Sequence, residues 1–472
     1  MEIEMPQGKN QSNETKDKSK YGRVVYRIDD PKKFQNETPL ILTEYQKRKV
    51  IRVNPINSSV TTSFVGGNTI DFVIKGHEYV NFRNSVIYAT LSCACIPSGE
   101  ADDVISLPFN SCSFIKRFQL FIGGGDPIEN INEYGYKQSI ISTLKQKTGR
   151  HSMMTLETSR PAAGGVGTRT MPCTAATTAN SNSDRTMANG PTIPAGGFIN
   201  QQFPIIIPLD FCLTESEYIN LYNINDEGIR ISLELDLPQN TLLCVGCTDP
   251  IYWISSPKLE LEVITTTTQN RLSKTPFTIR GKTFTQGSFL WGTTSSVNSN
   301  IQTHNVSVNS IIFALRSAAA IKNITAGKMR DGIHDALADA PLINVTLGVD
   351  NDLYPFSRTL DTSQLKWMAL KQYMKQYSMN QVGDNELFND TKYLTQTVDA
   401  TAHTMSIFPF SLESWPQESE IIDGIGGRNS TINITMEQKN GTALTATQLV
   451  TYFIGSDLLV TIEDGNVKTM NR

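Results

Sequence analysis

The feature that most constrains the fold is a duplication: the second half of the chain repeats the order of patterns found in the first. Each half has an apolar strand interrupted by proline, and Pro208 and Pro409 are 201 residues apart (409 − 208). The strictly alternating strands that follow keep the same spacing, since Ile432 comes 201 residues after Ile231 (432 − 231). A shared fixed offset indicates two copies of one β unit, and duplicated β units of this size are mostly structural.

Earlier in each half, a β-patterned strand ends at a glycine turn and leads into one helix. These strands, residues 118–122 and 343–347, are 225 residues apart (347 − 122), so the first copy must carry an insertion. Residues 146–195 account for it, because they are rich in Ala, Gly, Thr, Ser and Asn and nearly lack large apolar side chains from Pro161 onward. We predict a surface loop here rather than a linker, because β-patterned sequence resumes at Phe203 and completes the first unit.

The length of 472 residues is too great for one hydrophobic core and suits two domains of roughly 200 residues each. We predict an N-terminal arm over residues 1–22, disordered or ordered only by a partner, because it is polar and mixed in charge. The first β unit then spans residues 23–268 and the second spans residues 269–472. With 32 Gly and 21 Pro, the composition is typical of a turn-rich β protein.

Charge and cysteine content exclude several classes of function. A net charge of −4 and a pI of about 5.9 argue against sequence-specific nucleic-acid binding, which needs a basic surface. The seven cysteines lie mostly in apolar strand-like sequence, where a free thiol behaves as a small hydrophobe. Cys244 and Cys247 have the spacing of half a zinc site, but no second pair follows them. The chain shows no signal peptide and no apolar run long enough to cross a membrane.

Individual elements can be placed from periodicity. Alternation at Ile70, Phe72 and Ile74 predicts a half-buried strand, whereas residues 86–91 are apolar on both faces and predict a central or sandwiched strand. The helix of the first unit is predicted from a stripe of Ile131, Tyr134, Ile141 and Leu144. For the second unit, Asp361 or Thr362 is expected to cap a helix whose buried face carries Trp367, Leu370, Met374 and Tyr377.

A search for catalytic chemistry finds no catalytic, cofactor-binding or metal-binding residues to assign. The five histidines are scattered, at positions 77, 151, 304, 334 and 403. The glycines at 123–125 invite a phosphate-binding interpretation, but the nearby acids Asp126 and Glu129 would repel phosphate and favour a turn. Glu260 and Glu262 alternate with apolar residues, which is typical of the solvated face of a strand. The tryptophans at 253, 291, 367 and 415 are interpreted as core or interface anchors rather than a sugar-binding platform.

The predicted fold class is therefore all-β: two tandem eight-stranded jelly-roll β-sandwiches, each with a short helix at the mid-domain crossover. In this arrangement two sheets pack face to face and alternating side chains fill the space between them. An immunoglobulin-type sandwich fits less well, because it needs only about 100 residues and lacks the helix. Hydrophobic burial must stabilise both units, since no cofactor or disulfide is indicated.

At this point the sequence resembles the double jelly-roll major capsid proteins of the lineage that includes adenoviruses, polinton-like viruses, virophages and tailless icosahedral phages. Residues 122–129 (IGGGDPIE) and the Tyr-bearing helix after them are similar to one corner of the first roll, and residues 350–355 (DNDLYP) before the Trp367 helix to that of the second. Residues 407–412 (IFPFSL), 424–427 (GIGG) and 460–465 (VTIEDG) resemble its last strands. No string is specific alone; their order over some 400 residues carries the resemblance.

The resemblance implies a virion structural protein that forms pseudo-hexameric homotrimeric capsomers, which tile an icosahedral shell assembled inside the host cell. Its partners would be copies of itself, neighbouring capsomers, penton and minor or cement proteins, and an internal membrane in relatives that have one. The loop at 146–195 would face outward, and the arm at 1–22 would lie near the inner face. No enzymatic activity is implied.

Two other classes of function remain open at this stage. A tandem β-sandwich attachment protein, binding a receptor or glycan, would carry an exposed aromatic-lined cleft. A β-sandwich enzyme acting on glycans would need paired carboxylates facing one groove.

Overall fold

The computed structural model describes most of both β units and leaves several connections undescribed. The described residues are 46–57, 63–76, 79–97, 104–106, 111–145, 201–215, 219–221, 224, 227–245, 247–266, 277–305, 307–318, 343–350, 352–354, 359–376, 396–398, 401–403, 407–412, 424–426, 430–463 and 466–470. The predicted arm at 1–22 and the predicted loop at 146–195 lie outside them. So do Trp415, Tyr377 and the histidines at 77, 151 and 334.

The first half of the chain builds two antiparallel sheets, which we call the first roll. One has the strand order β1-β12-β4-β8, with β2 and β9 at its margins; the strands are β1 (Gln46–Val53), β2 (Ser63–Val65), β4 (Tyr79–Pro97), β8 (Gln201–Pro208), β9 (Ile219–Asn220) and β12 (Cys247–Thr266). The other has the order β3-β10-β6-β7, from β3 (Thr69–Ile74), β6 (Ile115–Ile122), β7 (Glu129–Asn132) and β10 (Ile229–Leu235). A short pair joins β5 (Val104–Ser106) to β11 (Leu243–Val245).

The second half repeats the four-strand order of both sheets, and we call it the second roll. Its larger sheet has the order β13-β23-β15-β20, with β21 and β24 at its margins; the strands are β13 (Phe277–Trp291), β15 (Ser307–Ser317), β20 (Ile407–Ser411), β21 (Ile425–Gly426), β23 (Gln448–Glu463) and β24 (Asn466–Met470). Its smaller sheet has the order β14-β22-β16-β17, from β14 (Ser296–Gln302), β16 (Ile343–Val349), β17 (Asp352–Tyr354) and β22 (Thr431–Gln438). A further pair joins β18 (Gln396–Val398) to β19 (Thr401–His403).

The alternation read from the sequence corresponds to burial in the strands. Along β3, Ile70, Phe72 and Ile74 are buried and the residues between them are partly exposed, as predicted. Pro208 and Pro409 both lie in strands at a sheet edge, where the missing N–H costs no ladder bond on the open side. Strand β4 is central in its sheet, as expected, but its second face is not fully covered, since Tyr88 is 41% exposed.

In each roll the helix follows the edge strand that ends the order of the smaller sheet, β7 in the first roll and β17 in the second. In the first roll, α2 (Tyr134–Lys145) follows β7, so the predicted helical stripe was wrong at Ile131, which belongs to β7. The error arose because Ile131 and Tyr134 are both fully buried, at a spacing that fits a helix as well as a strand followed by a turn. The side chain of Leu144 lies outside the described residues.

The helix of the second roll, α5 (Ser363–Gln376), begins where predicted, and Thr362 is the residue that caps it. The Thr362 hydroxyl oxygen accepts a hydrogen bond from the Leu365 backbone N–H at 3.3 Å. The buried face carries Lys366, Ala369, Leu370 and Tyr373. Of the predicted stripe, Leu370 is buried as expected, whereas Trp367 is only half-buried because the helix packs on β20. The side chain of Met374 lies outside the described residues.

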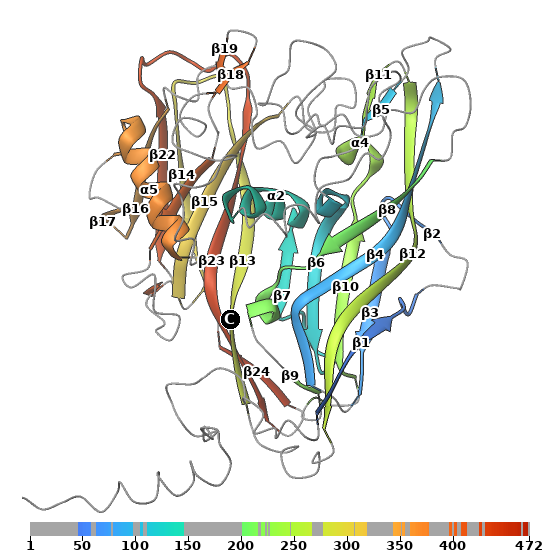
Figure 1. The fold of residues 1–472 in the computed structure, drawn as a ribbon. Coiled ribbons are helices and arrows are strands. Elements are labelled where there is room, and N and C mark those ends of the chain that lie inside the picture. The colour runs from blue at the N-terminus through green and yellow to red at the C-terminus, as the bar shows by residue number, and fades with distance from the viewer. Residues whose placement is uncertain are drawn as a thin grey trace, which may run out of the picture.

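Three short helical turns complete the described elements: η2 (Ser111–Phe114), η4 (Cys212–Glu215) and α4 (Pro238–Thr241). The two rolls stand side by side with their long strands running in similar directions, and α2 lies between them (Figure 1). In the same view α5 lies further from the first roll than α2 does, over the second roll, and it packs on β20. The two helices that are equivalent in chain order therefore have different surroundings.

Two groups of buried apolar side chains fill the molecule. One fills the second roll around Trp291, Phe313 and Phe410. The other fills the first roll around Phe72, Phe118 and Ile231 and continues into the second roll through residues such as Phe284, Ile312 and Phe453. Burying this shared surface is the main force that holds the rolls together.

Candidate functional site

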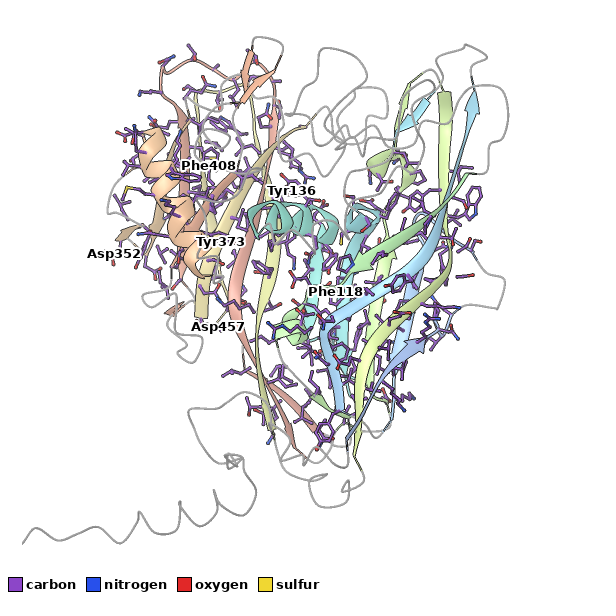
Figure 2. The ribbon with its side chains drawn as sticks, in the orientation of Figure 1. Phe118, Tyr136, Asp352, Tyr373, Phe408 and Asp457 are labelled. Carbon is purple, nitrogen blue, oxygen red and sulfur yellow. The ribbon has the colours of Figure 1, made fainter. Side chains whose placement is uncertain are left out.

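The contact between the rolls is the candidate functional site, because it removes several charged side chains from water and determines how the two sandwiches sit. On the first-roll side it is built by β7, α2 and η4, and on the second-roll side by β13, β15 and β23. Every residue from Tyr134 to Ile141 of α2 is buried, so this part of the helix is enclosed on all sides. Figure 2 labels Tyr136 on it, between the two rolls. A surface helix would keep one polar face in water.

Glu129 of β7 is a buried carboxylate at the centre of this contact. Its Oε2 accepts a hydrogen bond from the backbone N–H of Cys212 at 2.9 Å, and Thr283 of the second roll also hydrogen-bonds to it. Burial raises the pKa of Glu129, against the lowering effect of Lys137 and of these hydrogen bonds. The Lys137 ammonium lies 4.9 Å from the centre of the Phe284 ring on the second roll. The Glu129 carboxylate, the Lys137 ammonium and the Phe284 ring therefore link the two rolls through buried side chains.

A second cross-roll link is formed by Arg316 of β15. Its guanidinium stacks on the Tyr136 ring of α2 at 3.9 Å and lies 3.7 Å from the carboxylate of Glu133. Tyr136 also approaches Phe453 of β23, with ring centres 6.1 Å apart. Glu133 has a left-handed backbone, with φ of 54°, at the junction of β7 and α2. A buried ion pair gives little net stability but strongly penalises loss of one partner, so it selects this arrangement of the rolls.

The two backbones approach each other closely at Gly281 of β13. A Cβ atom built there would lie 2.3 Å from the carbonyl oxygen of Cys212 and within 3.0 Å of two more backbone atoms of that residue. Only glycine allows η4 to lie this close to β13. Nothing in the sequence pattern around residue 281 marks it as a contact, so this requirement could not be predicted.

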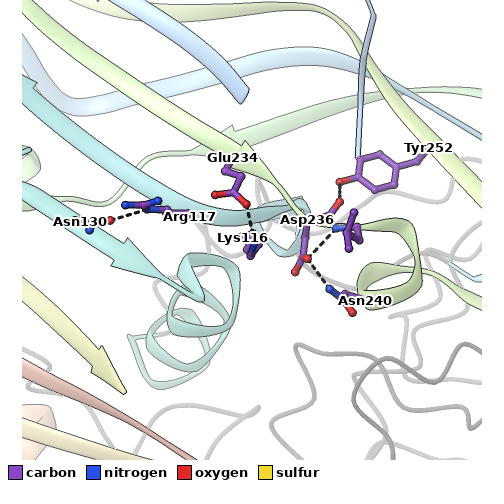
Figure 3. Close-up of polar contacts among 8 residues, drawn as sticks. Lys116, Arg117, Asn130, Glu234, Asp236, Asn240 and Tyr252 are labelled. Atoms are coloured by element: carbon purple, nitrogen blue, oxygen red, sulfur yellow. Dashed lines mark hydrogen bonds and ion pairs between the residues drawn. The ribbon is translucent and has the colours of Figure 1, made fainter. Parts of the chain in front are cut away.

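Away from the contact, a hydrogen-bond network centred on Asp236 fixes the segment directly after β10 at one end of the first roll (Figure 3). The Asp236 carboxylate accepts hydrogen bonds from the Leu237 backbone N–H at 2.8 Å and from the Asn240 side-chain amide at 2.7 Å. The Tyr252 hydroxyl of β12 donates to the Asp236 carbonyl oxygen. Burial raises the pKa of the Asp236 carboxyl, although the hydrogen bonds oppose the shift. The network ties one sheet to the other and is structural in character.

Where the structure describes them, the glycines and glutamates considered for a phosphate or glycan site do not form such a site. Gly123 and Gly124 adopt positive φ and form the turn between β6 and β7, so a strand, not a helix, follows them. This removes the basis for a phosphate site at a helix N-terminus. Glu260 is partly exposed and pairs with Arg52 at 2.6 Å, which fits the predicted solvated strand face.

Tryptophans and cysteines behave largely as expected where they are described. Trp291 is fully buried and its indole N–H donates to the Thr294 carbonyl oxygen, whereas Trp253 and Trp367 are half-buried. Cys112 and Cys212 are buried and form no disulfide. The side chains of Cys244 and Cys247 lie outside the described residues, so the half-site is not tested.

The described parts of the chain contain neither a metal-site cluster nor a membrane-spanning helix. Those residues hold no group of three or more His, Cys, Asp or Glu side chains that could bind a metal ion. Among the described helices, none is long and apolar enough to span a membrane. His304 is exposed, and the side chain of His403 on β19 lies outside the described residues.

Comparison with known proteins was made by sequence and by structure. No protein-family model matches the sequence, and no curated protein matches it. Solved structures match over nearly the whole chain. A chain of the PBCV-1 virus capsid has a TM-score of 0.56 at 11% identity, covering 95% of this chain and 98% of that one.

Two further solved structures match as completely. A chain of the Sputnik virophage has a TM-score of 0.55 at 13% identity, covering 95% and 93% of the two chains. The mavirus major capsid protein has a TM-score of 0.51 at 12% identity, covering 99% and 96%. The chain therefore has the double jelly-roll fold of solved viral major capsid proteins, which confirms the predicted fold class and the resemblance at the level of the fold.

Proposed function

We propose that this chain is a viral major capsid protein, the structural subunit of pseudo-hexameric homotrimeric capsomers that tile an icosahedral shell. The observation that carries the proposal is the end-to-end match of both rolls with solved capsid chains, covering 95–99% of this chain. A fold alone does not assign a function, so the proposal also needs features of this chain that suit a shell.

The contact between the rolls is the first such feature. It combines a continuous apolar surface, the buried Glu129 and the Arg316 stack, and it brings the two backbones into close contact at Gly281. Contacts between independent domains are more polar and allow relative motion. A shell subunit must keep its shape under load from its neighbours, and two sandwiches locked into one block meet that need.

The repeated architecture is the second feature. Three copies of a chain with two equivalent rolls present six similar sandwiches around a threefold axis, which allows hexagonal packing. In this arrangement we assign the first roll to residues 23–268 and the second to residues 269–472. The arm at 1–22 would lie at the inner face and the loop at 146–195 at the outer face.

The same role sets the partners and the location. The chain would sit in the virion after assembly in the host cell, bound to other copies, to neighbouring capsomers and to penton and minor or cement proteins. An internal membrane would be a neighbour only in a virus that has one. We infer no enzymatic activity and no sequence-specific binding of nucleic acid, in keeping with the net charge of −4.

The purified recombinant chain tests the proposal directly, through its native mass and its negative-stain image. A particle of three times 52.3 kDa with a hexagonal outline is the expected result. A monomer with no such outline would overturn the capsomer proposal. A monomer that also bound glycans on a screening array would support the attachment function instead.

A further inference from the structure

Strands at the edge of a sheet carry unpaired backbone N–H and C=O groups, and proteins usually guard them with a charged residue, a proline or a very short length. Every edge strand of the described sheets but one follows this rule. Those longer than three residues have charged residues in β1, β3, β7, β13 and β24, and prolines in β8 and β20. The exception is β14, whose seven residues, SVNSNIQ, include neither.

The unpaired side of β14, which we call the open edge, runs along residues 296–302. Within the described residues β14 pairs only with β22, over its whole length and without a register shift. No bulge therefore turns the open edge away from an approaching strand. Alternate side chains, from Ser296 to Gln302, are exposed on the outer face of the sheet, and those between them point toward the core. The open edge thus offers unpaired backbone groups along the entire strand.

Comparison with the first roll shows that the core is less completely covered beside β14. In the first roll, Ile70 of β3 pairs with Leu233 of β10. At the position 201 residues after Leu233 (434 − 233), Ile434 of β22 pairs with Ser299 of β14. Ser299 is therefore the counterpart of Ile70, yet Ile70 is 3% exposed and Ser299 is half-buried. Val297, on the same inner face of β14, is also only partly buried against the core.

The order of side chains in β14 is symmetric about Ser299. Moving outward from this residue, the side chains come in matched pairs: Asn298 with Asn300, Val297 with Ile301, and Ser296 with Gln302. When two such strands lie antiparallel and centred on Ser299, each residue faces the other member of its pair. Apolar side chains then meet on the inner face, and amides meet on the outer face. The strand is therefore complementary to a second copy of itself.

We propose that β14 of one copy pairs antiparallel with β14 of a second copy, about a twofold axis at Ser299. The two four-stranded smaller sheets then form one sheet of eight strands across the axis. A contact of this kind uses the same surface on both copies and needs a twofold axis. A threefold capsomer has no such axis, so the contact joins two different capsomers, and to that extent it rests on the proposed function.

The charges at the two ends of β14 are complementary in this pairing. Glu437 of β22 lies beside Ser296 at one end, and His304 lies two residues beyond Gln302 at the other; Glu437 and His304 are both exposed. Antiparallel pairing brings the Glu437 end of each copy next to the His304 end of the other, an acid beside a base. The seam itself carries no charge, so like charges do not face each other across it.

The contact is small, which suits a shell lattice better than a stable dimer in solution. Seven residues at about 3.4 Å each give a strand pair roughly 24 Å long, at the low end of the sizes of protein interfaces. Capsomers in dilute solution should therefore pair only briefly through β14. The experiment that tests the contact must trap the pair covalently.

Oxidation of Ser299→Cys capsomers with copper phenanthroline traps the pair, and non-reducing electrophoresis and native mass detect it. Residues opposite each other have Cβ atoms about 4.5–5.5 Å apart, close to the about 3.5–4.5 Å of a disulfide. We expect chains linked in pairs and particles of twice the capsomer mass. Ser296→Cys is the matched control and should not link, because the two introduced sulfurs would lie about 20 Å apart (six residues at about 3.4 Å). Wild type oxidised in the same way controls for the seven native cysteines.

Lysines placed at the seam test the pairing by a second route. Asn298→Lys with Asn300→Lys, added to Ser299→Cys, should abolish the link, whereas Asn433→Lys with Thr435→Lys, one strand further in, should leave it. Ser299→Cys capsomers that stay unlinked would overturn the pairing, leave the capsomer function standing and leave the open edge to an extended segment of another protein. Equal linking of Ser296→Cys would overturn the register. A monomeric wild type would overturn the capsomer function, and Ser299→Cys links between such monomers would still support the pairing.

Discussion

Replacing Gly281 by alanine should loosen the contact between the rolls. The added Cβ would lie 2.3 Å from the carbonyl oxygen of Cys212, and 2.9 Å and 3.0 Å from its carbonyl carbon and Cα. All three atoms belong to the backbone, so no rotation of a side chain can relieve the overlap. An ordinary contact needs at least 3.4 Å, so β13 and η4 must separate by about 1 Å (3.4 − 2.3).

The size of the effect follows from two opposing contributions. Removing a glycine lowers the entropy of the unfolded chain and alone would stabilise the protein by about 0.4–1 kcal/mol. Overpacking a close contact costs about 1–3 kcal/mol, and backbone that cannot yield places this site toward the upper end. The steric cost therefore exceeds the entropic gain. In a unit of about 150–250 residues each kcal/mol lowers Tm by roughly 2–4 °C.

Differential scanning calorimetry of the purified particle measures this change. We expect Gly281→Ala to lower Tm by several degrees and to split the unfolding into two transitions, because the rolls no longer unfold together. Gly292→Ala is the matched control, since a Cβ there meets no atom within 4 Å. If Gly281→Ala unfolds in one transition at the Tm of wild type and control, this glycine does not set the spacing of the rolls.

Three further predictions concern buried groups. Burial raises the pKa of Glu129 in the folded state. The free energy of unfolding is therefore highest below the unfolded-state pKa of about 4.3 and falls as the pH rises through the folded-state pKa. In wild type Tm should fall over this range, and Glu129→Gln should flatten that fall. Burial, and next the nearby charge of Lys439, lowers the pKa of Lys366 to about 8. Between about pH 8 and 10.4 the unfolded chain holds this proton and the folded chain does not, so the free energy of unfolding rises with pH. Urea titrations should show this rise in wild type and not in Lys366→Met. Phe118→Ala should lower the free energy of unfolding in guanidinium by about 3–5 kcal/mol, because Phe118 is fully buried against Tyr134. Trp367→Ala should lower it clearly less, because Trp367 is only half-buried. An equal loss for these two variants would contradict the burial described for α5.

Part of the candidate site could be anticipated from local patterns and part could not. The turn at Gly123 and the cap at Thr362 are local features, since both depend on residues a few positions away. The burial of Glu129 is not local, because its hydrogen-bond partner Cys212 lies 83 residues further along the chain. A glutamate in a short polar segment gives no signal that it will be enclosed.

The sequence by itself determined the number of units, their order and the face that each strand buries. These follow from period-two alternation and the repeated spacing of Pro208 and Pro409, which are properties of neighbouring residues. Only the tertiary structure decided that α2 is enclosed and α5 is not, because the two helices differ in what packs against them rather than in their own pattern. Gly281, Arg316 and Glu133 acquire their roles only when the second roll meets the first. Contacts between distant segments depend on the shape of both surfaces, and a one-dimensional pattern records each surface separately.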